Sequence, residues 1–491
     1  MPLNPADTNR ILSGALLAMF LAALEQTIVA TALPTIATDL GGFELISWLV
    51  TAYLLTSVCA TPIFGKLSDI YGRRPIMAIV LLVFLAGSVM CALATDMIFL
   101  ILARGLQGIG GGGLITLAQT VIADIVPPRE RGRYAAFFSG VWAVAALLGP
   151  TLGGVLAEHA GWPWIFWLNI PLGILALAVS DRALRRLPQV RRAVYIDYGA
   201  ILLLSAGTVA FLMLLSLAGR TFPWLSPASL ALAAATLVLW ALFGLKQRLS
   251  TEAILPARLV TDKVTGPVLG ALFLVFGCYL AIAVLAPAYL QIALGVSVSE
   301  SGLLMIPVML STTVTAAIAG RSTKTTGRYK LPALVSLPFA ILCLIAMGFM
   351  AGSASPWMAS AMLMAAGFGI GPIFPCSVVA AQNAVDPRDL GTVSGALGFT
   401  RSLGAAVVTA AASALVLGLY AAAMPGEGAA TLEEIALAGP SAQARAAVAD
   451  AFGVMFWAVA AALALGLAIF LRVEERPLRL NVARAEPAIA D

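Results

Sequence analysis

The chain has 491 residues, of which 61% are hydrophobic and 11% are charged, and its formal net charge is +5. A soluble domain is about one quarter charged, so this composition excludes a soluble globule and indicates that lipid covers most of the surface. The positive charge does not indicate a nucleic-acid partner, because the basic residues lie almost entirely in short loops. The five cysteines lie in apolar stretches without ligand spacing, and there is one histidine. We therefore expect no disulfide framework, no metal site and no cofactor.

Long apolar stretches recur along the whole chain. A membrane-spanning helix needs about 20 mostly apolar residues. Fourteen stretches qualify: 11–33, 46–68, 76–94, 97–122, 134–157, 163–181, 198–218, 225–245, 266–292, 301–320, 331–351, 356–380, 394–420 and 452–472. The first is too long for a signal peptide and carries Glu25, so we expect it to be retained. The predicted fold is an all-α integral membrane bundle of 14 transmembrane helices.

The basic residues predict the orientation of this bundle. Of the 29 Lys and Arg residues, Arg104 and Arg401 lie within spans, and only Arg220 and Arg445 lie in loops on the side opposite the N-terminus. The other basic residues lie on the side of the N-terminus. Positive loops face the cytoplasm, so we expect a multi-pass protein of the cytoplasmic (inner) membrane with both termini inside.

An internal repeat divides the chain. The glycine spacing of the loop that begins at Gly65 returns at Gly320, and the Pro-Arg turn at Pro128 returns at Pro387. Two six-helix halves that surround a central site are typical of alternating-access transporters. We predict an N-terminal half at 1–192, an inserted helix pair at 193–254, a C-terminal half at 255–480 and a cytoplasmic tail at 481–491.

Two oppositely charged side chains, Glu25 and Arg104, lie inside predicted spans. Such a group costs about 2.5–3.5 kcal/mol on insertion scales, so it usually faces a cavity or a partner. At about 1.5 Å per residue, both lie in the outer half of the membrane within about one helical turn of each other. We expect a direct or water-bridged pair, which either couples transport to a proton or only locks two spans together.

Four other features of the spans have alternative interpretations. Gln107 shares a helix face with Arg104 and either lines a cavity or bonds a neighbouring helix. Arg401 either snorkels toward the interface or contacts substrate or Asp69. The glycines of residues 108–113 satisfy a dinucleotide-binding search, but no strand precedes them, so they predict close helix packing. Aromatic residues of two spans either line a substrate cavity or only pack: Trp48, Tyr53, Phe276 and Tyr279.

Several local motifs lie at the ends and centres of these spans. They are the loop from Gly65 to Arg74, Arg104-Gly105-Leu106-Gln107-Gly108, Gly140 with Gly149-Pro150-Thr151-Leu152-Gly153-Gly154, Leu24-Glu25-Gln26-Thr27-Ile28-Val29 with Ala32-Leu33-Pro34, Trp164-Ile165-Phe166, and Asn169-Ile170-Pro171-Leu172-Gly173. With these motifs the chain resembles the major facilitator superfamily, and within it the fourteen-span drug:proton antiporters. It departs at Ile70, where that family usually has Arg, and at Glu25, where Asp is commoner.

The resemblance implies roles for particular residues. It implies a proton-coupling pair at Glu25 and Arg104 and a hinge or leak seal of exporters at Gly140, Gly149, Pro150, Gly153 and Gly154. It implies a gate on the cytoplasmic side at Gly65, Asp69, Gly72, Arg73, Arg74 and Asp124. The alternative is that these are solvated turn charges that only set the topology. Candidate substrate-cavity residues are Gln26, Trp48, Tyr53, Gln107, Phe276, Tyr279 and Arg401.

The function predicted from these features is proton-coupled export of amphipathic or cationic small molecules, as in multidrug efflux. We expect a monomer in the bilayer whose partners are the substrate and protons, with no nucleic acid. One alternative is a transporter of the same kind for an endogenous metabolite, vitamin or siderophore. A membrane sensor or enzyme is a more distant alternative, because no loop holds a catalytic domain and no catalytic constellation is present. The sequence contains no Walker-type loop, so it gives no support for transport driven by ATP.

Overall fold

A computed structural model describes residues 5–42, 45–185, 197–218, 222–250, 253–424, 432, 435 and 441–479. Within these residues, fourteen helical segments are long and apolar enough to cross a membrane. The predicted all-α fold of fourteen spans is therefore confirmed. The predicted tail at 481–491 and Arg220 lie outside the described residues.

The helices of the N-terminal part and the following pair occupy residues 5–249. They are α1 (Pro5–Ile28), the 3₁₀ turn η1 (Val29–Ala32), α2 (Leu33–Leu40), α3 (Ile46–Tyr71), α4 (Arg73–Ala92), α5 (Met97–Ile125), α6 (Pro128–His159), α7 (Pro163–Trp167), α8 (Asn169–Leu184), α9 (Tyr198–Leu217) and α10 (Pro227–Leu249).

The C-terminal part contains nine helices within the described residues. They are α11 (Ala257–Thr261), α12 (Thr265–Ile292), α13 (Val298–Thr326), α14 (Leu331–Met350), α15 (Pro356–Ile370), α16 (Ile373–Ala384), η3 (Pro387–Asp389), α17 (Leu390–Ala423) and α19 (Ala442–Leu471).

Some spans are not single helices. The span expected at 356–380 consists of α15 and α16, which meet at Gly371 and Pro372. Proline has no backbone N–H and its ring crowds the preceding turn, so the helical ladder breaks there. Other helices extend beyond the predicted stretch: α17 starts at Leu390 rather than 394. Hydropathy predicts only the part of a helix that crosses lipid.

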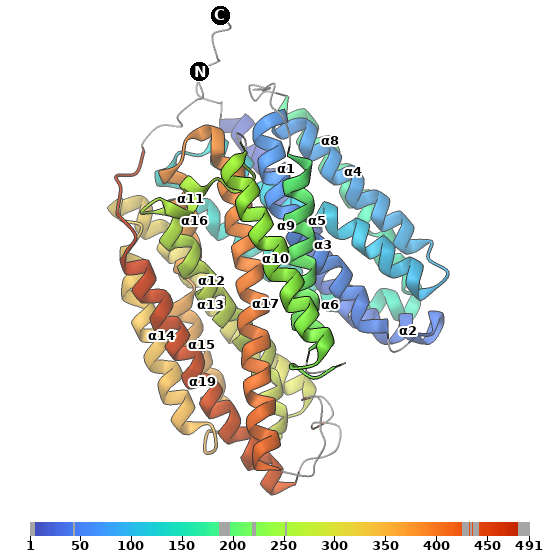
Figure 1. Ribbon diagram of the computed structural model, residues 1–491, viewed down its shortest axis with the longest axis vertical. Helices are drawn as coiled ribbons and strands as arrows, with labels where there is room; N and C mark the ends of the chain where they lie inside the picture. Colours follow the sequence, from blue (N-terminus) through green and yellow to red (C-terminus); the bar gives the residue numbers. More distant parts are fainter. Residues whose placement is uncertain are drawn as a thin grey trace, which may run out of the picture.

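The two ends of the bundle are distinguished by the chain ends. We call the end at which α1 begins and α19 ends the termini end, and the opposite one the far end. Figure 1 shows the N-terminal helices (blue to cyan) on one side and the C-terminal helices (yellow to red) on the other. The two groups lie closest near the termini end and spread apart toward the far end.

Separate hydrophobic cores lie within the two groups of helices. One core is formed almost wholly by residues of α11–α19, and two others by residues of α1–α8. The α9–α10 pair packs where the groups meet, since Ala200 and Leu204 share a cluster with Leu55 of α3 and Phe399 of α17. This packing agrees with two halves and an intervening pair, whose boundaries stay a prediction.

The segment after α19 is tied to the helix ends beside it. We call residues 473–479 the C-terminal strap. Asn383 at the end of α16 donates to the Pro477 carbonyl at 3.1 Å and accepts from the Arg479 N–H at 3.1 Å. The Tyr329 hydroxyl, before α14, accepts from the Arg476 N–H at 2.8 Å, and the Arg476 guanidinium contacts Asp262, before α12, at 3.0 Å. The strap therefore joins α12, α14, α16 and α19 at the termini end.

The sidedness of the bundle can be tested with one cysteine at each end. Ser353 lies in an exposed turn at the far end and Thr326 is exposed at the termini end of α13. All five native cysteines are buried, so background labelling should be low. An impermeant maleimide added to intact cells should label Ser353→Cys and not Thr326→Cys, because positive loops stay inside. Labelling of Thr326→Cys alone would reverse the orientation.

Candidate functional site

An ion pair lies in the interior of the N-terminal helices. Arg104 Nη1 of α5 lies 2.5 Å from Glu25 Oε1 of α1, and both side chains are almost wholly buried. The guanidinium also donates to the Leu49 carbonyl at 3.2 Å and stands 4.4 Å from the centre of the Tyr53 ring. The pair expected from the depth of the two residues is thus in direct contact.

The glycine run of α5 allows this close packing. A Cβ atom at Gly108 would lie 2.3 Å from the Tyr53 carbonyl, and one at Gly112 would lie 2.1 Å from the Ser57 carbonyl of α3. One at Gly110 would meet the backbone of Phe84 in α4 at 2.6 Å. Small residues let membrane helices approach closely, so the packing interpretation of residues 108–113 is confirmed.

Three neutral side chains complete a hydrogen-bond network around the ion pair. Asn169 Nδ2 of α8 donates to Glu25 Oε2 at 2.5 Å and to Ser88 Oγ of α4 at 3.2 Å. Gln107 accepts from Arg104 Nη1 at 2.6 Å and donates to Ser88 Oγ at 2.7 Å. Gln107 thus bonds a neighbouring helix, which is the second of its two interpretations. We call these five residues the buried network.

Asn169 and Ser88 are the members of the buried network that sequence reasoning missed as site residues. Each is a polar residue inside an apolar span, and Asn169 lies in a motif already singled out. Buried polar groups are nearly always hydrogen-bonded. A search for the hydrogen-bond partners of Glu25 and Arg104 among the polar residues of other spans could therefore have identified Asn169 and Ser88. The network surrounds the Glu25 carboxylate with the Arg104 guanidinium and the Asn169 amide.

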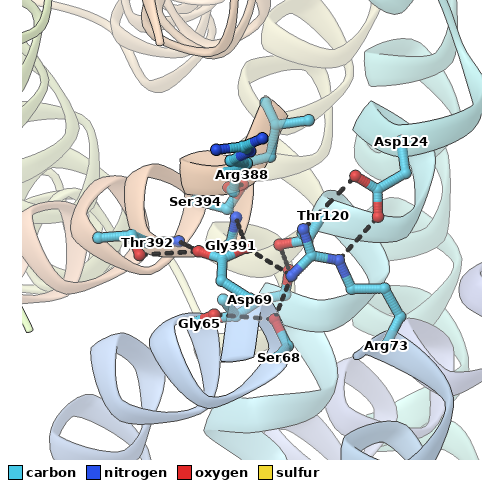
Figure 2. Close-up of polar contacts among 12 residues, drawn as sticks. Gly65, Ser68, Asp69, Arg73, Thr120, Asp124, Arg388, Gly391, Thr392 and Ser394 are labelled. Carbon is cyan, nitrogen blue, oxygen red and sulfur yellow. Dashed lines mark hydrogen bonds and ion pairs between the residues drawn. The ribbon is translucent and has the colours of Figure 1, made fainter. Parts of the chain in front are cut away.

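A second polar cluster lies at the termini end (Figure 2). Arg73 Nη1 contacts Asp69 Oδ1 at 2.6 Å, and Arg73 Nε contacts Asp124 Oδ2 at 2.7 Å. Asp69 also accepts from the Gly391 N–H at 2.9 Å and from the Thr392 N–H at 2.6 Å. The first N–H groups of a helix have no partner within it and carry positive partial charge. Asp69 therefore joins α3 to the N-terminus of α17.

The other predicted gate residues lie around this cluster. Gly72 separates α3 from α4 with a φ of 92°, a conformation that favours glycine. Arg74 does not join the cluster: its Nε contacts Asp181 Oδ1 of α8 at 2.7 Å. Ile70 is buried, and the cluster of Asp69, Arg73 and Asp124 is complete without a cation there.

Glycines bring the two groups of helices into backbone contact beside Asp69. A Cβ atom at Gly65 would lie 2.4 Å from the Gly391 carbonyl oxygen, and one at Gly395 would lie 2.9 Å from Pro62 Cα. Nearby, Lys324 of α13 reaches Glu130 of α6 at 3.7 Å. The termini end is therefore closed by contacts between the two groups.

The predicted exporter motif in α6 divides into packed and open positions. A Cβ at Gly149 would meet Thr27 Oγ1 at 2.1 Å, and one at Gly153 would meet the Ile28 carbonyl at 2.3 Å. No described atom lies within 4 Å of a Cβ at Gly140 or Gly154. Pro150 lies inside α6 beside the packed pair. The motif therefore holds α6 against α1, which carries Glu25.

The predicted cavity residues do not form one cluster. Tyr53 packs beneath Arg104, Trp48 packs with the cluster that contains Leu55 and Ala200, and Gln26 is half-buried on α1. In the C-terminal helices, Phe276 and Tyr279 lie 5.9 Å apart between ring centres. Arg401 stands over the Phe276 ring at 5.2 Å.

Fourteen spans, a paired intramembrane charge and a polar contact between two helix groups define a membrane transporter. Residues 15–409 match the sequence pattern of the Major Facilitator Superfamily, and the chain belongs to that family.

Several relatives of the chain are described as transporters or efflux pumps. It is 34% identical to multidrug transporter protein MdtP of Bacillus subtilis over 80% of this chain and 72% of that protein. It is 31% identical to multidrug resistance protein 3 of the same organism over 81% and 78%, and 35% identical to efflux pump dotC of Dothistroma septosporum over 84% and 72%.

Solved structures share the fold at low sequence identity. A bacterial homologue of the iron transporter ferroportin in an outward-facing state superposes with a TM-score of 0.65 at 14% identity, covering 96% of this chain and 99% of that one. The proton:xylose symporter XylE superposes with a TM-score of 0.61 at 16% identity, covering 95% of each chain. Family membership and the transporter descriptions of the relatives together identify the chain as a transporter rather than an enzyme.

The close glycine contact predicts the effect of one methyl group. Gly65→Ala should hold α3 away from α17, because its Cβ would lie 2.4 Å from the Gly391 oxygen. A short bifunctional thiol reagent should then cross-link Glu130→Cys to Lys324→Cys severalfold less than without Gly65→Ala. Gly418→Ala, at an open position of α17, should leave the yield unchanged. An equal yield in both variants would mean that the glycines do not set this contact.

Proposed function

We propose that this protein is a proton-coupled antiporter that exports amphipathic small molecules by alternating access across the cytoplasmic membrane. The buried network around Glu25 is the observation that carries the proposal. An ionisable residue at this depth is a functional candidate by default, and here Arg104 and Asn169 contact the carboxylate while Gln107 and Ser88 hold those two side chains in place. The multidrug and efflux descriptions of the relatives support export of drug-like substrates.

In this proposal Glu25 carries the proton. A carboxylate beside a cation is stabilised in its ionised form, and one in an apolar pocket is stabilised in its protonated form. Arg104 supplies the cation, while Asn169 and Gln107 fix the geometry of the pair. A shift of α1 against α5 would change how strongly Arg104 holds the carboxylate charge, and so would load or release the proton.

Asp69, Arg73 and Asp124 act as the gate in the proposed cycle. With the termini end inside the cell, their contacts close the cytoplasmic side and leave substrate release to the far side. The gate has to open once per cycle, and its contacts to α17 are hydrogen bonds between Asp69 and the helix terminus rather than a second ion pair. Hydrogen bonds to a charged group contribute about 1.5–3 kcal/mol each, and in the proposed cycle these bonds break and form again in every turnover.

The proton gradient is large enough to drive this exchange. One proton that crosses about 150 mV releases about 3.5 kcal/mol. That energy sustains a gradient of roughly a few hundredfold in a neutral substrate. An endogenous metabolite, vitamin or siderophore is the second candidate substrate. It is supported by a relative described as the acurin A biosynthesis cluster MFS-type transporter of Aspergillus aculeatus, to which this chain is 32% identical over 81% of its length and 73% of that protein.

Substitutions at the ion pair test the coupling. Glu25→Gln should abolish substrate-induced proton release in liposomes, because the amide still bonds Arg104 but has no titrating proton. Glu25→Asp should keep part of the release. Arg104→Ala should lose transport, because a buried carboxylate without its cation holds its proton too tightly, and Arg104→Lys should be milder. Glu158→Gln, at an exposed site of α6, is the matched control. Wild-type release by Glu25→Gln would place the carrier elsewhere.

A substitution at the gate tests its part in the cycle. Asp69→Asn should insert and fold like wild type but transport severely more slowly, because the amide has one acceptor oxygen instead of two and no negative charge for Arg73. Transport rates should be compared at equal expression, with Asp450→Asn on the exposed face of α19 as control. Normal turnover of a well-expressed Asp69→Asn protein would assign the cluster to topology alone.

A further inference from the structure

Arg401 is an intramembrane cation without an acidic partner. Among the described residues, no carboxylate oxygen lies within 4 Å of its guanidinium and no hydrogen bond reaches it. The guanidinium stands over the face of the Phe276 ring, at 5.2 Å from its centre. Arg104, the other intramembrane arginine, has a carboxylate, an amide and a carbonyl as partners. A charged group inside a span is normally paired, so the five donors of Arg401 call for an acceptor from outside the chain.

The position of Arg401 on α17 directs it between the two groups of helices. A Cβ at Gly398 would meet Thr61 of α3 at 2.7 Å, and one at Gly404 would meet the Phe273 carbonyl of α12 at 2.1 Å. At 3.6 residues per turn, Arg401 points about 60° from each of these directions. It therefore lies on the side of α17 between α3 and α12, about 9 Å along the helix axis from Gly395 of the glycine contact that closes the termini end. Its side chain is half-buried there.

An aromatic cluster stands beside the guanidinium. The rings of Phe276 and Tyr279 of α12 meet the Phe374 ring of α16 edge to face, with centres 5.5 and 5.6 Å away. Aromatic pairs in this geometry present both faces and edges to a third ring. A planar carboxylate matches the fork of an arginine, which can bind both of its oxygens. The cluster thus offers one charged and one apolar contact to the same small molecule.

We propose that Arg401, Phe276, Tyr279 and Phe374 form a binding site for amphipathic organic anions, with the carboxylate on Arg401 and an aromatic or apolar body on the three rings. The inference deepens the proposed function, on which it rests, by assigning an acidic substrate class. Of the amphipathic or cationic molecules expected from the sequence, the site favours amphipathic anions over cations, because the guanidinium would repel a cation.

A matched set of naphthalene probes tests the charge preference. Binding of 2-naphthoate, neutral 2-naphthamide and cationic 2-naphthylmethylammonium is measured on the full chain in zwitterionic nanodiscs, with empty nanodiscs subtracted. Wild type should bind naphthoate at least about tenfold more tightly than naphthamide, since a hydrogen bond to a charged group contributes that much. Equal affinities, or tighter binding of the cation, would overturn the inference.

Variants assign the preference to Arg401. Arg401→Gln should lower naphthoate affinity to that of naphthamide while naphthamide binding, which reports folding, stays unchanged. Arg401→Lys should keep most of the preference, and Phe276→Ala should weaken both probes alike. Arg472→Gln, at the exposed end of α19, removes the same charge and should change nothing. A preference that survives Arg401→Gln would place the anion elsewhere.

This measurement is independent of proton coupling. Binding is read without a gradient, so anion preference with no substrate-induced proton release would contradict only the antiport mechanism. Proton release that is equal for naphthoate and naphthamide, with equal affinities, would contradict only the acidic substrate class.

Discussion

A carboxylate that is cut off from water needs other groups to stabilise its charge, and in the N-terminal helices this requirement governs the packing around it. Glu25 has no exposed surface. Arg104 contacts one of its carboxylate oxygens and Asn169 contacts the other. Loss of one partner of a buried pair costs about 3–5 kcal/mol. The glycine run of α5 and the packed glycines of α6 can be understood as the means by which α1, α3, α4 and α6 come close enough to complete that shell.

Two helices connect this shell to the contact at the termini end. Arg104 and Asp124 both lie on α5, twenty residues apart, which corresponds to about 30 Å. Tyr53, beneath Arg104, and Asp69 both lie on α3. Energetic coupling between distant sites is carried by packed elements that have two arrangements. In the proposed cycle, a change in the charge of Glu25 would therefore reach the gate through α3 and α5 as rigid bodies.

Hydropathy and motif spacing predicted the number of spans, and depth alone predicted that Glu25 and Arg104 meet. These properties depend on distance along a helix axis, which the sequence gives directly. The sequence does not directly give the rotation of each helix about its axis, because that rotation depends on which other helices pack against it. Sequence reasoning therefore missed Asn169 and Ser88 as partners, and left open whether Gln107 faced a cavity. Sequence reasoning also placed Trp48 and Phe276 in one candidate substrate cavity, although Trp48 packs near α9.

The C-terminal strap has a consequence for which parts of the protein can move. Asn383, Tyr329 and Asp262 bind the strap from three different helix ends, so α12, α14, α16 and α19 cannot separate at the termini end without breaking that set together. The contact between α3 and α17 consists of the glycine contacts, the hydrogen bonds of Asp69 and the packing of Leu55 with Phe399. The strap ties α12, α14, α16 and α19 into one body at the termini end. Relative motion is therefore expected between the two groups of helices rather than within the C-terminal one.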